Sequence, residues 1–354
     1  MNLHPIHIEN DNFVELYQIL KKYKNQKIFL LVDENTQKFC LPLIEQMVLA
    51  FKLIVIEIKS GEVNKTLATC EFIWKKLLES QANRNAILVN LGGGVLTDMG
   101  GFVAATFKRG IKFINIPTTV LGASDAAIGG KTGVDLAMFK NQIGVFAKPE
   151  AVLINSSFFK TLPVRQVNSG LAEIIKSALI ADKKLWNVLL ERHVLQIIKW
   201  DHIIHESVKV KMDIVSRDPF EAGDRKLLNF GHTIGHAIET YSLKHDENAL
   251  LHGEAIAIGI ICEAFISVKK LGLSDKSLKT IVRYLFNHYH AYNLESSALE
   301  ELVALMVQDK KNTNDQINFT LLRNIGEGVI DQYVDLNLIK ESLEFYIGHI
   351  NTTD

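Results

Sequence analysis

Residues 86–107, AILVNLGGGVLTDMGGFVAATF, combine a short β-branched apolar run, three consecutive glycines and a longer helix-like segment. This order predicts a strand, a tight turn at Gly92, Gly93 and Gly94, and a helix whose first backbone N–H groups face the turn. A phosphate group fits such a turn, but the glycine spacing differs from GxGxxG. A turn without a ligand stays an open alternative at this point.

Four further apolar runs have the same character as the start of this stretch: residues 27–34, 52–60, 111–119 and 151–157. Amphipathic segments separate them, which predicts βαβ units and a mostly parallel sheet. Later segments carry apolar residues at three- and four-residue spacing, as helices do: residues 168–199, 201–216 and 227–243. We predict an α/β Rossmann-like domain with a parallel sheet over residues 1–160 and a mainly α-helical domain over residues 161–354. The active site is expected in the cleft between them, and residues 316–328 favour a hairpin.

The composition excludes several classes of partner. The chain has 354 residues, 47% of them hydrophobic, and a formal net charge of −1, so no global field attracts nucleic acid or an anionic membrane. Cys40, Cys70 and Cys262 are isolated and odd in number, which favours buried thiols over a disulfide framework. The N-terminal segment lacks a basic region followed by an apolar run, and Glu254 and Glu263 interrupt the most apolar stretch. We expect a cytoplasmic protein that binds a small molecule, with no nucleic acid and no membrane.

Other polar residues support a nucleotide site in the first domain. Asp33 ends the run FLLVD, where a carboxylate reaches a ribose hydroxyl in dinucleotide folds, and Glu62 with Lys65 follows the next run. Residues 117–135, PTTVLGASDAAIGGKTGVD, form a long polar, glycine-rich passage that we predict to have little regular structure. Loops of this kind usually serve a ligand.

A metal site is expected in the second domain. His232 and His236 in LNFGHTIGHAIE are four residues apart, so on a helix they project from one face. His252 begins another apolar helix, and Glu173 lies amid apolar residues, where a lone carboxylate is costly to bury. One Glu with two His leaves a fourth zinc position open, as catalytic sites require. Four candidates compete for three places, and a pair of hydrogen-bonded core histidines remains the alternative.

Basic residues accompany these motifs and suit an anionic substrate. Arg225 lies four residues before Asn229, and we expect both on the helix that bears the histidines. The other cations in this group are Lys131, Lys140, Lys176 and Lys211.

With these residues assembled, the sequence resembles the 3-dehydroquinate synthases of the sugar phosphate cyclase family. The resemblance runs from Asp33 to the lysines at 310 and 311, and its motifs are PTTVLGASDAAIGGKTGVD, SGLAEIIK, LNFGHTIGHA and LHGEA. It implies that Glu173, His232 and His252 bind the metal, Zn²⁺ or Co²⁺. His236 would then face the substrate phosphate and handle protons.

The resemblance also implies two further groups of residues. NAD would contact Asp33, Glu62, Lys65, Gly92, Gly93, Gly94, Asp98, Thr118, Thr119, Asp125, Lys140 and Thr161. The substrate would contact Asp125, Lys131, Asn141, Lys176, Lys211, Arg225 and Asn229, with Arg109 and Lys310 or Lys311 near its phosphate.

The substrate implied is 3-deoxy-D-arabino-heptulosonate 7-phosphate, whose two anionic groups account for the many cations. The reaction implied is transient oxidation with NAD, phosphate elimination, re-reduction and intramolecular aldol closure, a lyase reaction that does not consume NAD. A homodimer and domain closure on ligand are also expected from the family. This chain departs from the family pattern at Ala126 and Ala127, where relatives often carry serines.

Three rival interpretations remain. Another sugar phosphate cyclase would make a cyclitol by the same chemistry, although Lys211 and Asn229 match the dehydroquinate-forming pattern. A metal-dependent dehydrogenase of the glycerol-dehydrogenase type would not need the phosphate-binding cations. A non-catalytic descendant is disfavoured because the expected ligands are all present.

Overall fold

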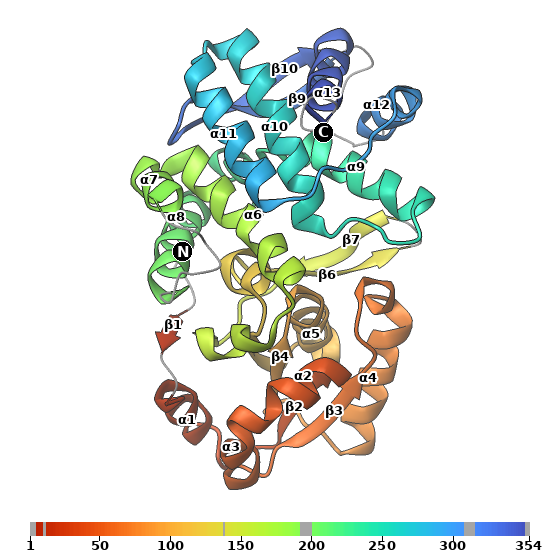
Figure 1. Cartoon of the computed structure of the whole chain (residues 1–354). Coiled ribbons are helices and arrows are strands. Elements are labelled where there is room, and N and C mark those ends of the chain that lie inside the picture. Colours follow the sequence, from red (N-terminus) through yellow and green to blue (C-terminus); the bar gives the residue numbers. More distant parts are fainter. Residues whose placement is uncertain (1–4, 10–11, 137–138, 192–199, 308–315, 351–354) are drawn as a thin grey trace. The chain divides into compact units, whose positions relative to one another are not determined.

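The computed structural model describes residues 5–9, 12–136, 139–191, 200–307 and 316–350. The chain forms two compact units (Figure 1): Met1–Pro163 with Lys199–Val208, and Val164–Ile198 with Lys209–Asp354. Helix α8 (Trp200–Arg217) begins in the first unit and ends in the second.

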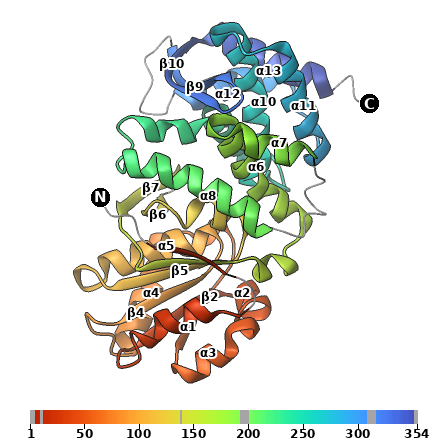
Figure 2. The same ribbon diagram turned by 90° about the vertical axis from the view of Figure 1, so that its left-hand side faces the viewer.

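A six-stranded sheet forms the centre of the first unit (Figure 2), and every neighbouring pair of its strands is parallel. Its order is β1-β8-β5-β4-β2-β3. The strands are β1 (Ile6–Glu9), β2 (Ile28–Asp33), β3 (Ile54–Ile58), β4 (Ile87–Gly92), β5 (Lys112–Pro117) and β8 (Ala151–Asn155). Strands β2, β4 and β8 are buried at every position, as expected of parallel strands that are covered on both faces. The five strands predicted from apolar runs and the α/β class are confirmed, whereas β1 was not predicted.

Helices connect these strands along the chain. They are α1 (Val14–Lys21), α2 (Glu34–Phe39), α3 (Glu45–Ala50), α4 (Leu67–Glu79) and α5 (Gly94–Thr106). The core between α4, α5 and the sheet includes Phe29, Leu88, Met99 and Phe113. Helix α5 begins directly after the glycine turn, so the strand, turn and helix predicted for residues 86–107 are confirmed.

The passage at residues 117–135 is more regular than predicted. A π-helical turn spans Gly122–Ala126, and β6 (Lys131–Leu136) pairs with β7 (Phe139–Phe146) in an antiparallel hairpin. Gly133 and Gly144 face each other in this pairing, and a Cβ at Gly133 would lie 2.6 Å from the carbonyl oxygen of Ile143. The glycines that suggested a loop thus allow two backbones to approach closely.

The second unit is mainly helical, as predicted, and α10 (His252–Leu271) lies at its centre (Figure 1), in contact with α6, α9, α11, α13 and β9. The other elements are α6 (Val164–Ala181), α7 (Lys183–Glu191), α9 (His232–His245), α11 (Asp275–His288), α12 (Leu299–Val307), α13 (Leu336–Ile350), β9 (Gln316–Asn324) and β10 (Glu327–Asp335). The predicted hairpin is confirmed as β9 and β10, which continue to Asp335. Among the described helices, none is long and apolar enough to cross a membrane.

Two predicted helices need correction. Residues 168–191 form two helices, because the side chain of Asp182 accepts hydrogen bonds from the backbone N–H groups of Lys184 and Leu185 and so starts α7. Residues 192–199 lie outside the described part. Residues 224–229 form a 3₁₀ turn that precedes α9, and Gly231, with φ of 80°, separates the two. The prediction that Arg225 and Asn229 share the histidine helix is therefore wrong.

Candidate metal centre and nucleotide-binding residues

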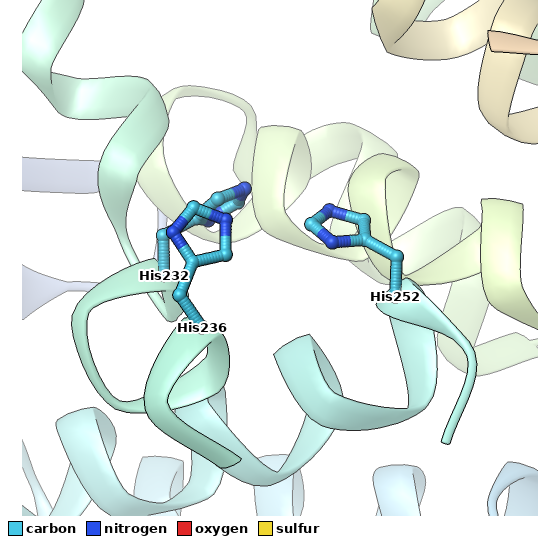
Figure 3. Close-up of side chains that lie close together, drawn as sticks. All are labelled: His232, His236 and His252. Carbon is cyan, nitrogen blue, oxygen red and sulfur yellow. The ribbon is translucent and has the colours of Figure 1, made fainter. Parts of the chain in front are cut away.

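Three helices of the second unit place one carboxylate and three imidazoles close together. Glu173 comes from α6, His232 and His236 from α9, and His252 from α10. The three rings face one another (Figure 3), with centroids 5.1 to 5.7 Å apart, and one nitrogen from each ring lies within 4.8 Å of the others. The Oε1 atom of Glu173 lies 3.4 Å from Nε2 of His232 and 3.4 Å from Nε2 of His252. All four candidates from the sequence are thus brought together.

Close helix packing explains why glycines accompany these histidines. A Cβ at Gly253, next to His252, would lie 1.9 Å from the carbonyl oxygen of Ser169, one turn before Glu173 on α6. A Cβ at Gly259 on α10 would lie 2.0 Å from the carbonyl oxygen of Gly231, next to His232. Only hydrogen fits at these positions, so the glycines set how closely α10 approaches α6 and α9.

The donors have the burial and chemistry that a divalent metal requires. Glu173 is 1% exposed, and no described residue donates a hydrogen bond to either of its oxygens in acceptable geometry. A buried carboxylate without donors is costly unless a cation compensates it. Lys176, one turn later on α6 and 2% exposed, forms an ion pair with it. Lys176 lies at Oε2, whereas Oε1 faces Nε2 of both His232 and His252, an arrangement that fits a metal such as Zn²⁺.

The surroundings affect the titration of the two histidines differently. Burial and the Lys176 ammonium lower the pKa of His232 well below its usual value. Burial also acts to lower the pKa of His252, but the carboxylates of Glu239 and Glu173 outweigh it and raise that pKa to about 9. Although burial opposes it, the positive charge of Lys176 and the neighbouring histidines lowers the pKa of the Glu173 carboxyl.

Sequence reasoning missed two buried carboxylates at this centre. Oε2 of Glu239, on α9, lies 3.3 Å from Nδ1 of His252. Glu263, on α10, accepts hydrogen bonds from the backbone N–H groups of Gly231 (2.6 Å) and Ile234 (3.2 Å) at the start of α9. A usable signal was present in both cases, because each is an acidic residue inside an apolar helix.

The predicted cations of the second unit occupy different elements. Lys211 is buried on α8, and Arg225 is buried in the 3₁₀ turn, where its guanidinium donates to the carbonyl oxygen of Pro219. The side-chain amide of Asn229 donates to Glu221 at 3.0 Å. Lys310 and Lys311, predicted near the substrate phosphate, lie outside the described residues.

In the first unit, residues predicted for NAD and substrate cluster around Lys65. Its ammonium, in a side chain that is 4% exposed, donates to Asp98 and to the side-chain oxygen of Asn141, both at 2.7 Å. Glu62 lies 3.9 Å from Lys65 and 3.8 Å from Lys140. Burial acts to lower the pKa of Lys65, but the carboxylates of Asp98 and Glu62 raise it above its usual value.

A second group surrounds the glycine turn. The backbone N–H of Thr118 donates to the carbonyl oxygen of Gly92, and a Cβ at Gly93 would lie 3.0 Å from Cγ2 of Thr119. The side chain of Asp33 accepts from Thr36 and caps α2. The π-helical turn that contains Asp125 packs against the glycine turn, since a Cβ at Gly94 would lie 3.0 Å from Cβ of Ala126. The remaining predicted residues of this unit lie at other positions: Lys131 at the start of β6, and Arg109 and Thr161 at the ends of 3₁₀ turns.

The predicted substrate contacts are therefore divided between the two units. Arg109, Asp125, Lys131 and Asn141 belong to the first, and Lys176, Lys211, Arg225, Asn229 and His236 to the second. That these two groups act on one substrate stays a prediction.

Comparisons with known proteins agree with these features. Residues 55–169 match the family model described as 3-dehydroquinate synthase N-terminal, and residues 170–312 match the model described as 3-dehydroquinate synthase C-terminal. The 3-dehydroquinate synthase of Parabacteroides distasonis is 42% identical over 334 residues, which cover 94% of each chain.

Two solved structures share the fold at lower identity. The 2-epi-5-epi-valiolone synthase of Streptomyces hygroscopicus, with NAD⁺ and Zn²⁺ bound, is 23% identical, with a TM-score of 0.84 over 99% of this chain and 98% of that one. A 2-deoxy-scyllo-inosose synthase complexed with carbaglucose-6-phosphate, NAD⁺ and Co²⁺ is 24% identical, with a TM-score of 0.83 over 96% of each. The family models and the 42% identical relative are decisive: this chain belongs to the 3-dehydroquinate synthase family.

Proposed function

We propose that this protein is a 3-dehydroquinate synthase, a lyase that converts 3-deoxy-D-arabino-heptulosonate 7-phosphate to 3-dehydroquinate and phosphate. Together with family membership, the observation that carries this proposal is the Glu173 carboxylate, whose Oε1 lies 3.4 Å from Nε2 of both His232 and His252. The activity would depend on NAD and on one divalent metal.

Glu173, His232 and His252 would hold the metal, Zn²⁺ or Co²⁺, both of which accept imidazole and carboxylate ligands. When bound, it would act as a Lewis acid toward the substrate hydroxyls. His236 would stay outside the ligand set. Its more exposed ring, on the same face of α9, would hold or release a proton beside the substrate phosphate.

The glycine turn and the first turn of α5 would receive the NAD pyrophosphate. Backbone N–H groups at a helix N-terminus favour anions, and the lack of side chains at Gly92, Gly93 and Gly94 allows close approach. The cofactor would supply reversible hydride acceptance, so no net NADH would accumulate.

Buried cations would hold the anionic substrate. Lys176, Lys211 and Arg225 are each no more than 5% exposed, and a charge removed from water interacts more strongly with a carboxylate or phosphate. Fixing one intermediate through several steps is a positioning task, for which buried and immobilised side chains are suited.

The test is turnover of the heptulosonate phosphate with NAD, measured as phosphate release and dehydroquinate formation before and after treatment with a chelator. We expect turnover that needs both NAD and metal, with no net NADH. The Glu173→Gln variant should lose at least about 100-fold in activity, the upper range for weakened metal sites. Glu301→Gln, at a partly exposed glutamate of α12, is the control and should keep full activity.

A wild type that binds NAD and metal but shows no turnover would contradict the proposal, and cyclitol-forming sugar phosphates would then be assayed.

Two accompanying proposals have separate tests. A homodimer predicts twice the chain mass in light scattering, and the cytoplasmic location predicts recovery in the cytoplasmic fraction of the source cells.

A further inference from the structure

The His252 imidazole lies between two buried carboxylates. Its Nδ1 is 3.3 Å from Oε2 of Glu239, and its Nε2 is 3.4 Å from Oε1 of Glu173. The side chains of Glu239 and Glu173 are 4% and 1% exposed. Each nitrogen of the ring thus has its own carboxylate, held away from water.

With a metal bound this ring is neutral, and its surroundings decide which nitrogen carries the single proton. A neutral imidazole has one N–H and one lone pair, and a metal takes the lone pair. When the lone pair of Nε2 goes to a metal, the single ring proton lies on Nδ1, where the Glu239 carboxylate accepts it. The lone pair of Nε2 then faces Glu173, where the metal is proposed.

His232 reaches the same tautomer through a different partner. Its Nδ1 lies 3.1 Å from the carbonyl oxygen of Phe230, which likewise only accepts, and its Nε2 also lies 3.4 Å from Oε1 of Glu173. Both rings therefore direct Nε2 at one carboxylate oxygen. His232 is oriented by a backbone carbonyl two residues earlier in the chain, whereas His252 is oriented by a side chain from another helix.

Helix geometry supplies that side chain. Glu239 follows His232 by seven residues and His236 by three on α9, so all three lie on one face of the helix. The same face thus contributes a ligand, the more exposed His236 and the carboxylate that contacts His252 on α10.

We propose that Glu239 is a positioning residue that fixes the tautomer and ring orientation of His252 for metal binding. The inference rests on the metal dependence in the proposed function. A glutamate with a merely structural role would change the stability of the metal-free protein but not the coordination geometry of the loaded one.

The test compares Co²⁺ binding by the wild type, Glu239→Gln and Glu239→Ala, using competition with a chromogenic chelator and the visible absorption of the Co²⁺-loaded protein. We expect both variants to bind Co²⁺ about 10- to 100-fold more weakly and to show an altered Co²⁺ spectrum. Glu301→Gln is the matched control, since Glu301 contacts Nε2 of His245 at 3.0 Å at the exposed end of the same helix. It should bind Co²⁺ as the wild type does.

Wild-type affinity and an unchanged spectrum in Glu239→Gln would overturn the inference and leave the proposed function standing. A wild type that binds no Co²⁺ would overturn both. A measurement without substitution covers the case of a variant that does not fold: long-range ¹H–¹⁵N histidine spectra of the Zn²⁺-loaded wild type. They should show the proton of His252 on Nδ1, and a proton on Nε2 would overturn the inference.

Discussion

At the scale of single residues, the metal centre depends on positions that carry no side chain. The Cβ that Gly253 lacks would lie 1.9 Å from the backbone oxygen of Ser169, and the Gly253 N–H donates to the Ser169 hydroxyl at 3.1 Å. Glu173 follows Ser169 by one turn, and His252 precedes Gly253. The contact between these two backbones thus helps to set the distance between a carboxylate and an imidazole that are proposed to bind one metal.

Gly253→Ala should therefore weaken the centre. We expect a loss of about 1–3 kcal/mol in the free energy of unfolding, because α6 and α10 must move apart to accept the methyl group. Co²⁺ affinity should fall as well, because Glu173 moves away from His252. Urea unfolding and chelator competition measure the two effects.

Gly348→Ala provides the control. A Cβ at Gly348 on α13 meets no atom within 4 Å, so alanine should be neutral or stabilise the helix by up to about 1 kcal/mol. If Gly253→Ala matched this control in stability and in Co²⁺ affinity, close backbone packing would not be what positions the ligands.

The sequence pattern pointed to the four candidate ligands that the structure brings together, but spacing alone could not choose among them. Helical spacing placed His232 and His236 on one face, and burial cost singled out Glu173, yet periodicity says nothing about which ring meets which carboxylate. The choice depends on contacts between α6, α9 and α10. Glu239 was missed for the same reason, since its partner His252 lies thirteen residues away on another helix.

At the scale of elements, a side chain from the neighbouring helix α10 caps the N-terminus of α9. Gly231 is the N-cap residue and offers no side chain to the exposed N–H groups of the first turn. The Glu263 carboxylate of α10, 0% exposed, accepts from Gly231 and Ile234 instead. The helix that carries His232 thus begins at a cap supplied by the helix that carries His252.

This cap predicts a pH-dependent stability. Burial raises the pKa of Glu263 to about 8, although the backbone N–H groups of α9 act to lower it. The unfolded value is about 4.3. Between these values the folded protein holds a proton that the unfolded chain has released, so the free energy of unfolding falls as pH rises through this window. The contribution is fully present below the unfolded pKa and is lost above about pH 8.

Glu263→Gln cannot release that proton and should flatten the dependence. Between about pH 4.3 and pH 8, we expect the free energy of unfolding of the wild type to fall by up to about 1.4 kcal/mol per pH unit more than that of the variant. Urea unfolding at several pH values between 5 and 9, without metal, gives the difference. Glu344→Gln, at an exposed position of α13, should follow the wild type, and parallel wild-type and Glu263→Gln curves would contradict the prediction.

Strands and helices could be predicted where the apolar pattern of a segment matches its burial in the folded protein. Strands β2, β4 and β8 are apolar runs that become buried on both faces, so their sequence already reflects their surroundings. The β6–β7 hairpin lacks such a pattern. Its polar, glycine-rich strands are held by contacts from distant residues, such as Lys65 to Asn141, which periodicity does not show. The break before α9 likewise depends on Gly231, whose positive φ interrupts an otherwise helical pattern.

At the scale of the whole molecule, the two proposed cofactor sites belong to different units. The glycine turn and the Lys65 group lie within Met1–Pro163, whereas Glu173, His232, His236 and His252 all lie in the second unit. No described donor of the metal centre comes from the first unit. NAD binding and metal binding should therefore be separable, although the proposed turnover would need both.

Calorimetric titration tests this separation. After chelation, the wild type should bind NAD with unchanged affinity, because the glycine turn needs no metal ligand. Gly93→Val should do the opposite and weaken NAD binding at least about 10-fold. A Cβ there would already lie 3.0 Å from Cγ2 of Thr119, and the added methyl groups would crowd the turn that is proposed to receive the pyrophosphate.

Co²⁺ affinity is the internal control, since Gly93→Val should leave it at the wild-type level. If chelation weakened NAD binding, NAD binding and metal binding would be linked by a coupling free energy even without substrate. By reciprocity, NAD would then raise Co²⁺ affinity by the same factor. If metal raised NAD affinity and NAD raised Co²⁺ affinity by the same factor, the two sites would be coupled. If neither ligand changed the affinity for the other, only the substrate would link the two sites.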